Sequence, residues 1–333
     1  MSKQTSAENI TLFAESQRFL RQLTADIEGA TSSIYIQCMS FEADRIGREL
    51  IKLLSGKPAV ERILLIDNYS RYVVNDTFVY SPLGLMNKNS ALSERRALDP
   101  LLQQAKEAGI RVQFTSPMGF LLSRYPKRNH KKMVLVDQKI SYVGGMNFTE
   151  HNFAWHDLMV RHTEPALGRA LEKSFMGDLQ GHSEEAVFAV DKFTKLYILN
   201  GYQTVGYYTE LLELIQSANK IVAVSPYISY PFLDAIAGVP DNRVLVPAPN
   251  NKSYAGYVQQ LNRYDRINYR YIPDRMIHMK FLLIDDNIAI YGSSNFDTVS
   301  YFFEKEILIK KEDPFLVEKL DELAVKLMNN GMT

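Results

Sequence analysis

One pattern of residues occurs twice in this chain of 333 residues, and it limits the possible folds more than any other feature. The first copy spans residues 130–147 and the second spans residues 278–295. In both copies His and Lys are two positions apart, Lys and Asp five, Asp and Gly seven, and Gly and Asn three. Residue frequencies alone would produce one His-to-Lys-to-Asp string of this spacing at about the per-cent level. Two copies with the same Gly and Asn offsets therefore indicate a duplicated unit.

Each copy has the pattern of a strand, a tight turn and a second strand. Residues 133–136 and 140–143 are almost all apolar, which favours a hairpin that is buried on both faces. His130 and Lys132 are two positions apart, so their side chains point to the same face of the strand. Gly145 removes a side chain at a point where backbone or a ligand must come close.

The residue types of the repeat suit chemistry at a phosphodiester, which needs a nucleophile, donors to the phosphoryl oxygens and a proton for the leaving alkoxide. Histidine can act as nucleophile, acid or base near neutral pH. Lysine and asparagine side chains can donate hydrogen bonds to phosphoryl oxygens. The catalytic candidates are His130, Lys132, Asp137, His278, Lys280 and Asp285, and the substrate-binding candidates are Asn147, Asn295, Gly145 and Ser293.

The two copies resemble the paired HKD motifs of the phospholipase D superfamily, and within it the chain is most similar to the bacterial cardiolipin synthases. The resemblance implies an α/β fold of two duplicated α/β/α halves, with mixed central sheets packed around one shared active site. It also implies a covalent phosphohistidine intermediate, no metal and no other cofactor. As family members usually work, His130 would be the nucleophile and His278 the general acid and then the general base. The sequence itself has no His, Cys or carboxylate cluster at the usual metal-ligand spacing.

Two acidic residues are candidates for orienting the histidines through the second ring nitrogen. Asp157 lies ten positions after the Asn of the first copy, in a run that resembles the W-x-D sequence of cardiolipin synthases. Glu306 lies eleven positions after the Asn of the second copy. Asp137 and Asp285 fall at the hairpin turns, where a scaffold role is as open as a direct catalytic role.

The rest of the chain alternates apolar strands with helical periodicity, and this pattern restarts near residue 197. We predict two halves, residues 1–176 and residues 177–333, with residues 177–192 as a linker. The first half carries about 37 extra residues before its histidine, most of them within residues 68–98. This stretch is either a surface excursion with ordinary packing or a substrate lid or membrane-facing loop.

Residues 117–128, just before His130, combine an apolar tip with a basic flank. That combination suits an interface with anionic lipid, and the alternative is a loop packed on the core. Lys127, Arg128 and Lys131 are expected to form a solvated basic rim that helps to draw in an anionic head group.

Several residues near the motifs stand outside the repeat. His151, His156 and His162 are expected to be structural or surface residues, because no partner spacing repeats in the second half. Val299 stands where relatives often carry Arg, and Glu304 where they often carry Asn. These two departures bear on the substrate and leave the expected fold unchanged.

Charge and hydrophobicity narrow the class of protein. The formal net charge is zero, which disfavours non-specific binding to nucleic acid. Residues 1–10 lack the apolar core of a secretory signal, and no run approaches the ~18 apolar residues of a membrane-spanning helix. The only cysteine, Cys38, lies in an apolar strand and is expected to be a small buried residue. We expect a cytoplasmic protein, with peripheral contact to the inner face of the cell membrane left open.

The leading hypothesis is a phosphatidyltransferase that acts on phospholipid at a membrane surface. It would pass a phosphatidyl group to a second alcohol, such as the glycerol head group of phosphatidylglycerol. With water as the acceptor, the same site would be a phospholipase D hydrolase. A nuclease of the same superfamily is a further alternative, with nucleic acid as the less favoured partner. A catalytically inactive scaffold is disfavoured because both motif sets are complete.

Overall fold

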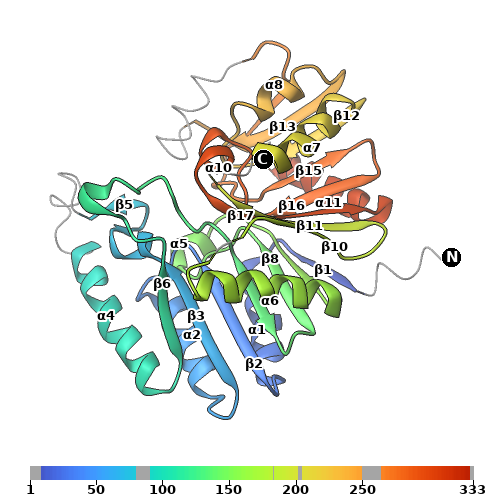
Figure 1. Cartoon of the computed structure of the whole chain (residues 1–333). Helices are drawn as coiled ribbons and strands as arrows, with labels where there is room; N and C mark the ends of the chain where they lie inside the picture. Colours follow the sequence, from blue (N-terminus) through green and yellow to red (C-terminus); the bar gives the residue numbers. More distant parts are fainter. Residues whose placement is uncertain (1–8, 80–90, 183, 202–204, 250–263, 331–333) are drawn as a thin grey trace.

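The computed structural model describes residues 9–79, 91–182, 184–201, 205–249 and 264–330. Two mixed β-sheets face each other, and each has helices against it (Figure 1). The strands of the first sheet run in the order β1 (Ile10–Phe13), β9 (Met159–His162), β8 (Ile140–Gly144), β7 (Met133–Val136), β2 (Ser33–Cys38), β3 (Glu61–Asp67) and β6 (Arg111–Thr115). The strands of the second run in the order β10 (Ala186–Ala189), β11 (Thr194–Asn200), β17 (Lys305–Glu312), β16 (Ile288–Gly292), β15 (Phe281–Ile284), β12 (Lys220–Val224), β13 (Asp241–Pro247) and β14 (Tyr269–Ile272).

The two sheets repeat the same topology, which confirms the predicted duplication. In the first, β2 and β3 pair in parallel, as do β3 and β6, while the β7–β8 hairpin joins β2 antiparallel. In the second, β12, β13 and β14 are parallel neighbours, and the β15–β16 hairpin joins β12 antiparallel. Both motif copies therefore form the hairpin in the middle of a sheet.

Helices cover both faces of each sheet. The outer face of the first sheet packs against α1 (Ser16–Glu28), α2 (Arg45–Ser55) and α4 (Ala91–Glu107), and that of the second against α7 (Val205–Gln216), α8 (Phe232–Ile236) and α10 (Thr298–Phe302). Between the sheets lie α6 (Pro165–Leu179) and α11 (Pro314–Asn330), which share one apolar core with strands of both halves. The shared core fixes the two motif hairpins relative to each other.

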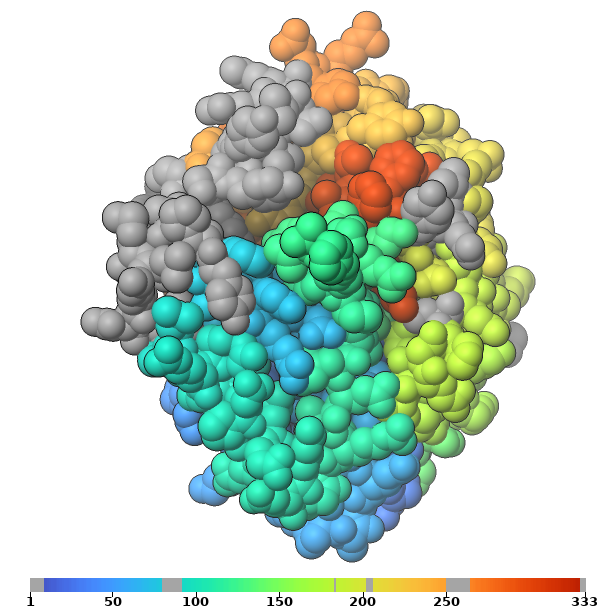
Figure 2. Space-filling view, turned by 60° about the vertical axis from the view of Figure 1, so that its left-hand side comes forward, coloured from blue at the N-terminus to red at the C-terminus, as the bar shows by residue number. Residues whose placement is uncertain are grey.

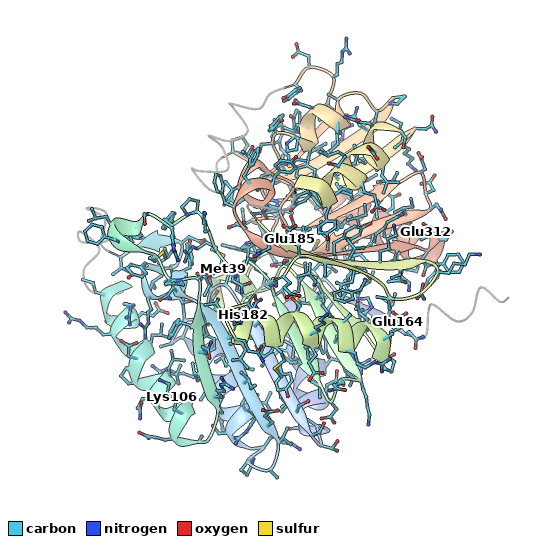
Figure 3. The ribbon with its side chains drawn as sticks, viewed as in Figure 1. Met39, Lys106, Glu164, His182, Glu185 and Glu312 are labelled. Atoms are coloured by element: carbon cyan, nitrogen blue, oxygen red, sulfur yellow. The ribbon has the colours of Figure 1, made fainter. Side chains whose placement is uncertain are left out.

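The halves are joined along the whole interface between the sheets. Met39 and Glu164, both labelled in Figure 3, mark its two ends. At the Glu164 end, Lys311 Nζ of the second half lies 3.3 Å from the Glu164 Oε1 atom. At the Met39 end lies the pocket described below.

Most predicted elements are present, and one prediction is wrong. Residues 177–192 were expected to be a linker, but they contain the last turn of α6 and the edge strand β10. A four-residue strand with intermediate burial has too short an apolar pattern to stand out in a sequence. The half boundary at residue 176 falls inside α6 and stays a prediction.

The additional stretch of the first half is only partly described. Residues 68–79 form the 3₁₀ turn η1 (Asn68–Arg71) and a small hairpin, β4 (Val73–Val74) with β5 (Thr77–Phe78). Residues 80–90 lie outside the described part, so the lid or surface role of this stretch stays a prediction. Cys38 is buried, as expected. Within the described residues, the structure has no helix with both the length and the apolar character needed to span a bilayer.

Candidate active site

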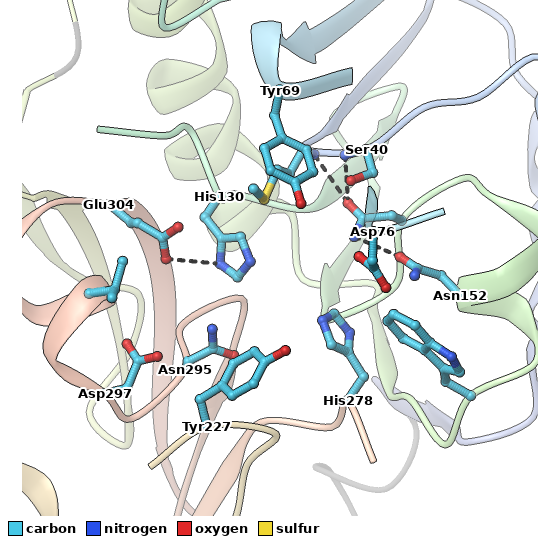
Figure 4. Close-up of a pocket in the computed structure, with 14 residues that line it drawn as sticks. Ser40, Tyr69, Asp76, His130, Asn152, Tyr227, His278, Asn295, Asp297 and Glu304 are labelled. Carbon is cyan, nitrogen blue, oxygen red and sulfur yellow. Dashed lines mark hydrogen bonds and ion pairs between the residues drawn. The ribbon is translucent and has the colours of Figure 1, made fainter. Parts of the chain in front are cut away.

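A pocket of about 170 Å³ lies where the two halves meet, and both motif histidines open into it (Figure 4). Its lining residues come from both halves. They are Met39, Ser40, Tyr69, Asp76, His130, Asn147, Asn152, Trp155, Tyr227, His278, Asn295, Asp297, Val299 and Glu304.

Backbone hydrogen bonds between the halves hold both histidines in place. His130 precedes β7, and its N–H donates to the Lys305 carbonyl oxygen of the second half over 2.9 Å. His278 precedes β15, and its N–H donates to the His156 carbonyl oxygen of the first half over 2.7 Å. Each histidine is therefore positioned by its own hairpin and by the opposite half.

The two predicted orienting carboxylates pair with the histidines crosswise. Glu306 Oε1 lies 2.6 Å from Nδ1 of His130, and Asp157 Oδ2 lies 2.6 Å from Nδ1 of His278. All four side chains are buried. Sequence offsets identify these carboxylates, but they cannot show that each one reaches the histidine of the other half.

A carboxylate on Nδ1 fixes the tautomer of each ring. In the neutral imidazole the proton then lies on Nδ1, and the lone pair of Nε2 faces the pocket. Burial lowers the pKa of His130 to about 3, so its ring is neutral at pH 7 and able to act as a nucleophile. Burial raises the pKa values of Asp157 and Glu306 to about 7.

The two motif lysines are buried and are not among the residues that line the pocket. Lys132 Nζ donates to the backbone oxygen of His130 over 2.7 Å, and Lys280 Nζ makes the equivalent bond to the backbone oxygen of His278. Burial lowers their pKa values to about 8 and about 7. Their positive charges lie next to the carboxylates and histidines, where negative charge on a bound phosphoryl group would be stabilised.

The two motif asparagines line the pocket but differ in their contacts. Asn147 Oδ1 accepts from the N–H groups of Met39 and Ser40, and its Nδ2 donates to Asn152 over 2.8 Å. Asn295 is buried, and within the described residues its Oδ1 has no hydrogen-bond partner. The amide of Asn295 therefore has capacity left for a ligand.

The predicted substrate contacts of Gly145 and Ser293 need correction. Neither residue is among those that line the pocket. A Cβ atom on Gly145 would lie 2.1 Å from Asp157 Oδ1, so this glycine makes room for the carboxylate. The Ser293 hydroxyl donates to Glu306 instead of facing a phosphate. Gly145 thus leaves space for Asp157, and Ser293 binds Glu306, so both residues act on the histidines through the carboxylates.

Asp137 and Asp285 are not at the site, which corrects their place among the catalytic residues. Both lie at the hairpin turns, at the opposite ends of β7 and β15 from the histidines. Asp137 accepts hydrogen bonds from Thr31, Ser32 and the N–H of Ser33. Asp285 accepts from the N–H groups of Asn219, which precedes β12, and Lys220, its first residue. Each aspartate joins its hairpin to the neighbouring central strand by hydrogen bonds. This is the scaffold role, which the sequence had left as open as a catalytic role.

The expected basic rim is also mostly wrong. Arg128 is buried and pairs with Asp67 Oδ1 over 2.9 Å, and Lys131 is buried and pairs with Asp178 Oδ2 over 2.9 Å. Only Lys127 of the three is exposed. A run of basic residues in the sequence cannot reveal buried acidic partners that lie far away along the chain.

The pocket contains an acidic wall that the sequence did not reveal as part of the site. Asp76, Asp297 and Glu304 all line it, and Figure 4 shows Glu304 directed at His130. Glu304 Oε2 lies 3.7 Å from Nδ1 of His130. Burial raises the pKa of Glu304 to about 7. Glu304 and Val299, the two departures from the family pattern, both lie at the pocket wall.

The structure also brings together a set of possible metal ligands, His130, Glu304 and Glu306, within 4.8 Å of one another. Spacing along the chain could not reveal it, because the carboxylates come from the opposite half. The single hydroxyl of Ser300 lies within hydrogen-bond distance of both carboxylates, and the Ser293 hydroxyl donates to Glu306. The expectation of a metal-free site stays a prediction.

Comparison with known proteins agrees with this geometry. The family model described as "Cardiolipin synthase, PLD-like domain" matches residues 23–179 and 211–328. The chain therefore belongs to this phospholipase D-like family, which confirms the resemblance and the predicted fold.

The individual relatives and the solved structure share only a small part of their sequence with this chain. The minor cardiolipin synthase ClsB of Bacillus subtilis (strain 168) is 24% identical over 324 residues, which cover 88% of this chain and 75% of the relative. Cardiolipin synthase 1 of Bacillus cereus is 26% identical over 339 residues, which cover 89% of this chain and 62% of the relative, so the chain spans less than two thirds of that protein. The crystal structure of phosphatidylserine synthase from Haemophilus influenzae Rd KW20 matches 98% of this chain and 86% of its own, with a TM-score of 0.68 and 15% identity.

Proposed function

We propose that the chain is a cardiolipin synthase-like phosphatidyltransferase, which transfers a phosphatidyl group from one phospholipid to the hydroxyl of another. The crossed pairs of histidine and carboxylate at a single pocket carry this proposal. They direct the Nε2 atoms of two imidazoles toward one pocket, where a phosphodiester would bind between them. The names of the relatives support the substrate class.

In the first half-reaction, His130 Nε2 attacks the phosphorus of the donor lipid. The bond from phosphorus to the head-group oxygen breaks, and protonated His278 gives its Nε2 proton to that oxygen. The head-group alcohol leaves, and the phosphatidyl group remains on His130 through a P–N bond. Lys132 and Lys280 stabilise the charge on the phosphoryl oxygens, while Glu306 stabilises the positive ring of His130.

In the second half-reaction, His278 Nε2, now neutral, takes the proton of an acceptor hydroxyl. The acceptor oxygen attacks phosphorus, the P–N bond breaks, and His130 returns to its neutral form. With two molecules of phosphatidylglycerol the products are cardiolipin and glycerol. Water in place of the acceptor lipid would give phosphatidic acid.

The acidic wall favours a head group that is rich in hydroxyls. The carboxylates of Asp76, Asp297 and Glu304 can accept hydrogen bonds from the hydroxyls of a glycerol head group. No lysine or arginine is among the residues that line the pocket, within the described part of the chain. This charge distribution disfavours a polyanionic nucleic acid, which binds best in a basic groove. We place the protein in the cytoplasm, with peripheral contact to the inner face of the membrane.

A mass-resolved product assay tests the proposal. Purified protein is incubated with phosphatidylglycerol vesicles and, in parallel, with single-stranded and double-stranded DNA. We expect cardiolipin and glycerol in equal amounts, and none from His130→Ala. Phosphatidic acid as the main product would make the protein a hydrolase. Cleaved DNA with intact lipid would refute the proposed substrate class.

A further inference from the structure

The loop before His130, residues 117–128, projects from the molecule with its apolar tip uncovered. Phe120 is 85% exposed and Leu121 is 84% exposed. Among the described residues, the next most exposed large apolar side chain is Phe193, at 53%. The loop forms the green projection near the centre of Figure 2, beside the red residues of the second half. This result rules out the alternative of a loop packed on the core.

The tip is held outward by an ordered backbone. Three of its residues have left-handed φ angles, which are 73° at Gly119, 50° at Leu121 and 59° at Leu122. Leucine adopts this region only where the surroundings impose it. Hydrogen bonds inside the loop impose it here, from the N–H of Arg124 to the Met118 oxygen over 2.9 Å and from that of Tyr125 to the Leu122 oxygen over 2.8 Å.

The base of the loop is fixed to the active site. Buried Arg128 pairs with Asp67, and Asp67 Oδ2 also accepts from the N–H of Asn129 over 2.7 Å. The next residue is His130. The exposed tip is therefore joined to the candidate nucleophile by a short segment with buried polar anchors at its end.

The charged residues within the loop have one sign. Arg124 and Lys127 are exposed, and residues 117–128 contain no aspartate or glutamate. Apolar side chains that enter a bilayer, flanked by cations that meet anionic head groups, form the usual combination of a peripheral membrane anchor.

Aromatic side chains lead from the tip to the pocket. The Tyr125 ring lies 6.3 Å from that of Phe78, and Phe78 stacks on Tyr72 at 6.3 Å. The Tyr72 N–H donates to the Tyr69 carbonyl oxygen over 2.9 Å, so Tyr72 and Tyr69 lie in one turn. Tyr69 lines the pocket. A lipid whose acyl chains stay near the tip could place its phosphate at His130.

From these observations we propose that loop 117–128 inserts Phe120 and Leu121 into an anionic lipid bilayer and so places the pocket at the membrane surface. The inference rests on the proposed function only in the choice of a lipid partner. Its test is a binding assay that needs no turnover, so its failure and the failure of the proposed function can be distinguished.

The test is co-sedimentation with vesicles of phosphatidylcholine alone and of an equimolar mixture with phosphatidylglycerol. We expect wild type to prefer the mixture, and the double variant Phe120→Ser, Leu121→Ser to bind about ten to a hundred times more weakly. The variant Arg124→Gln, Lys127→Gln should lose the preference for phosphatidylglycerol and the dependence on salt. His130→Ala should bind like wild type.

Phe193→Ser is the matched control, because Phe193 is an exposed aromatic beside Lys192 in the β10–β11 turn, on the other side of the molecule in Figure 1. It should bind like wild type. Equal binding by the Phe120 and Leu121 double variant and wild type would refute the proposal. The same holds if sedimentation velocity shows that this variant loses only self-association, because the tip would then contact a second copy of the chain.

Discussion

At the scale of single residues, the site depends on two carboxylates that are not among the residues that line the pocket. Glu306 and Asp157 each hold one histidine ring through Nδ1 and thereby aim Nε2 into the pocket. Gly145 and Ser293 in turn make room for or bind these carboxylates. The repeated His, Lys and Asn residues could be found in the sequence by spacing alone. The crossed pairing could not, because it depends on how the two halves face each other.

Removing either carboxylate charge should slow the reaction without unfolding the protein. We expect Asp157→Asn and Glu306→Gln each to lower kcat by about 10²- to 10⁴-fold, because the histidine loses its fixed tautomer. Steady-state kinetics would measure the loss, and thermal unfolding would confirm the fold. Asp286→Asn, at an exposed turn, serves as a control and should keep full activity. Wild-type kcat in either site variant would exclude the orienting role.

Chelators test whether the cluster of His130, Glu304 and Glu306 holds a metal. We expect turnover to be unchanged after dialysis against EDTA, because His130 Nδ1 and the carboxylates already bind one another and the nearby serine hydroxyls. Product formation before and after dialysis gives the answer. Activity that falls and then returns with an added divalent cation would contradict the phosphohistidine mechanism.

At the scale of single elements, the β7–β8 and β15–β16 hairpins are held by the aspartates at their turns. The aspartate of each motif therefore stabilises the framework. Its place in the sequence, at a turn next to apolar strand residues, does not distinguish this role from a catalytic one. Asp137 has a left-handed φ of 54°, a region that aspartate and asparagine tolerate. Its carboxylate accepts from three successive N–H groups at the start of β2.

Neutralising Asp137 should cost stability and spare the chemistry. We expect Asp137→Asn to lower the free energy of unfolding by about 1–3 kcal/mol, and Asp285→Asn by less, because Asp285 accepts fewer bonds. Urea unfolding measures both, and kcat of the folded protein should stay near wild type. A large loss of kcat with unchanged stability would return Asp137 to the catalytic group.

The difference in unfolding free energy between wild type and Asp137→Asn should also depend on pH. Burial alone would raise the pKa of Asp137, but the N–H groups of residues 31–33 outweigh it and lower the pKa. The stabilisation is therefore complete above the unfolded-state pKa of about 4 and is lost as the pH falls further. The gap in unfolding free energy between wild type and Asp137→Asn should close below about pH 4.

At the scale of the whole molecule, the two halves form one functional unit, because the shared core and the site both lie between them. The repeated motif predicted two similar halves, and the family resemblance implied a common site. Neither could predict the buried polar contacts between the halves, which join residues more than a hundred positions apart. One of these contacts is the stack of His162 from β9 on Tyr291 from β16, with ring centroids 5.9 Å apart.

His162 should make this interface sensitive to acid. It is fully buried, and burial, with a smaller effect of Lys311, lowers its pKa to about 3. The unfolded chain therefore binds a proton that the folded chain does not, and stability falls as the pH drops below about 6.5. Between pH 6.5 and pH 5 this amounts to about 2 kcal/mol.

Replacing His162 should remove that part of the pH dependence. We expect the unfolding free energy of His162→Phe to vary less between pH 7 and pH 5 than that of wild type, by about 2 kcal/mol. Urea unfolding at each pH measures it, with His182→Gln at an exposed position as the control. Parallel pH curves for His162→Phe and wild type would show that His162 binds its proton as readily in the folded protein as in the unfolded chain.

The most direct test of the two-histidine mechanism is to trap the covalent intermediate. Phosphatidylglycerol is mixed with the enzyme, the reaction is quenched in alkaline denaturant, and the peptides are analysed by mass spectrometry. We expect a phosphatidyl adduct on His130 and none in His130→Ala. An adduct on His278, or turnover without any adduct on histidine, would contradict this mechanism.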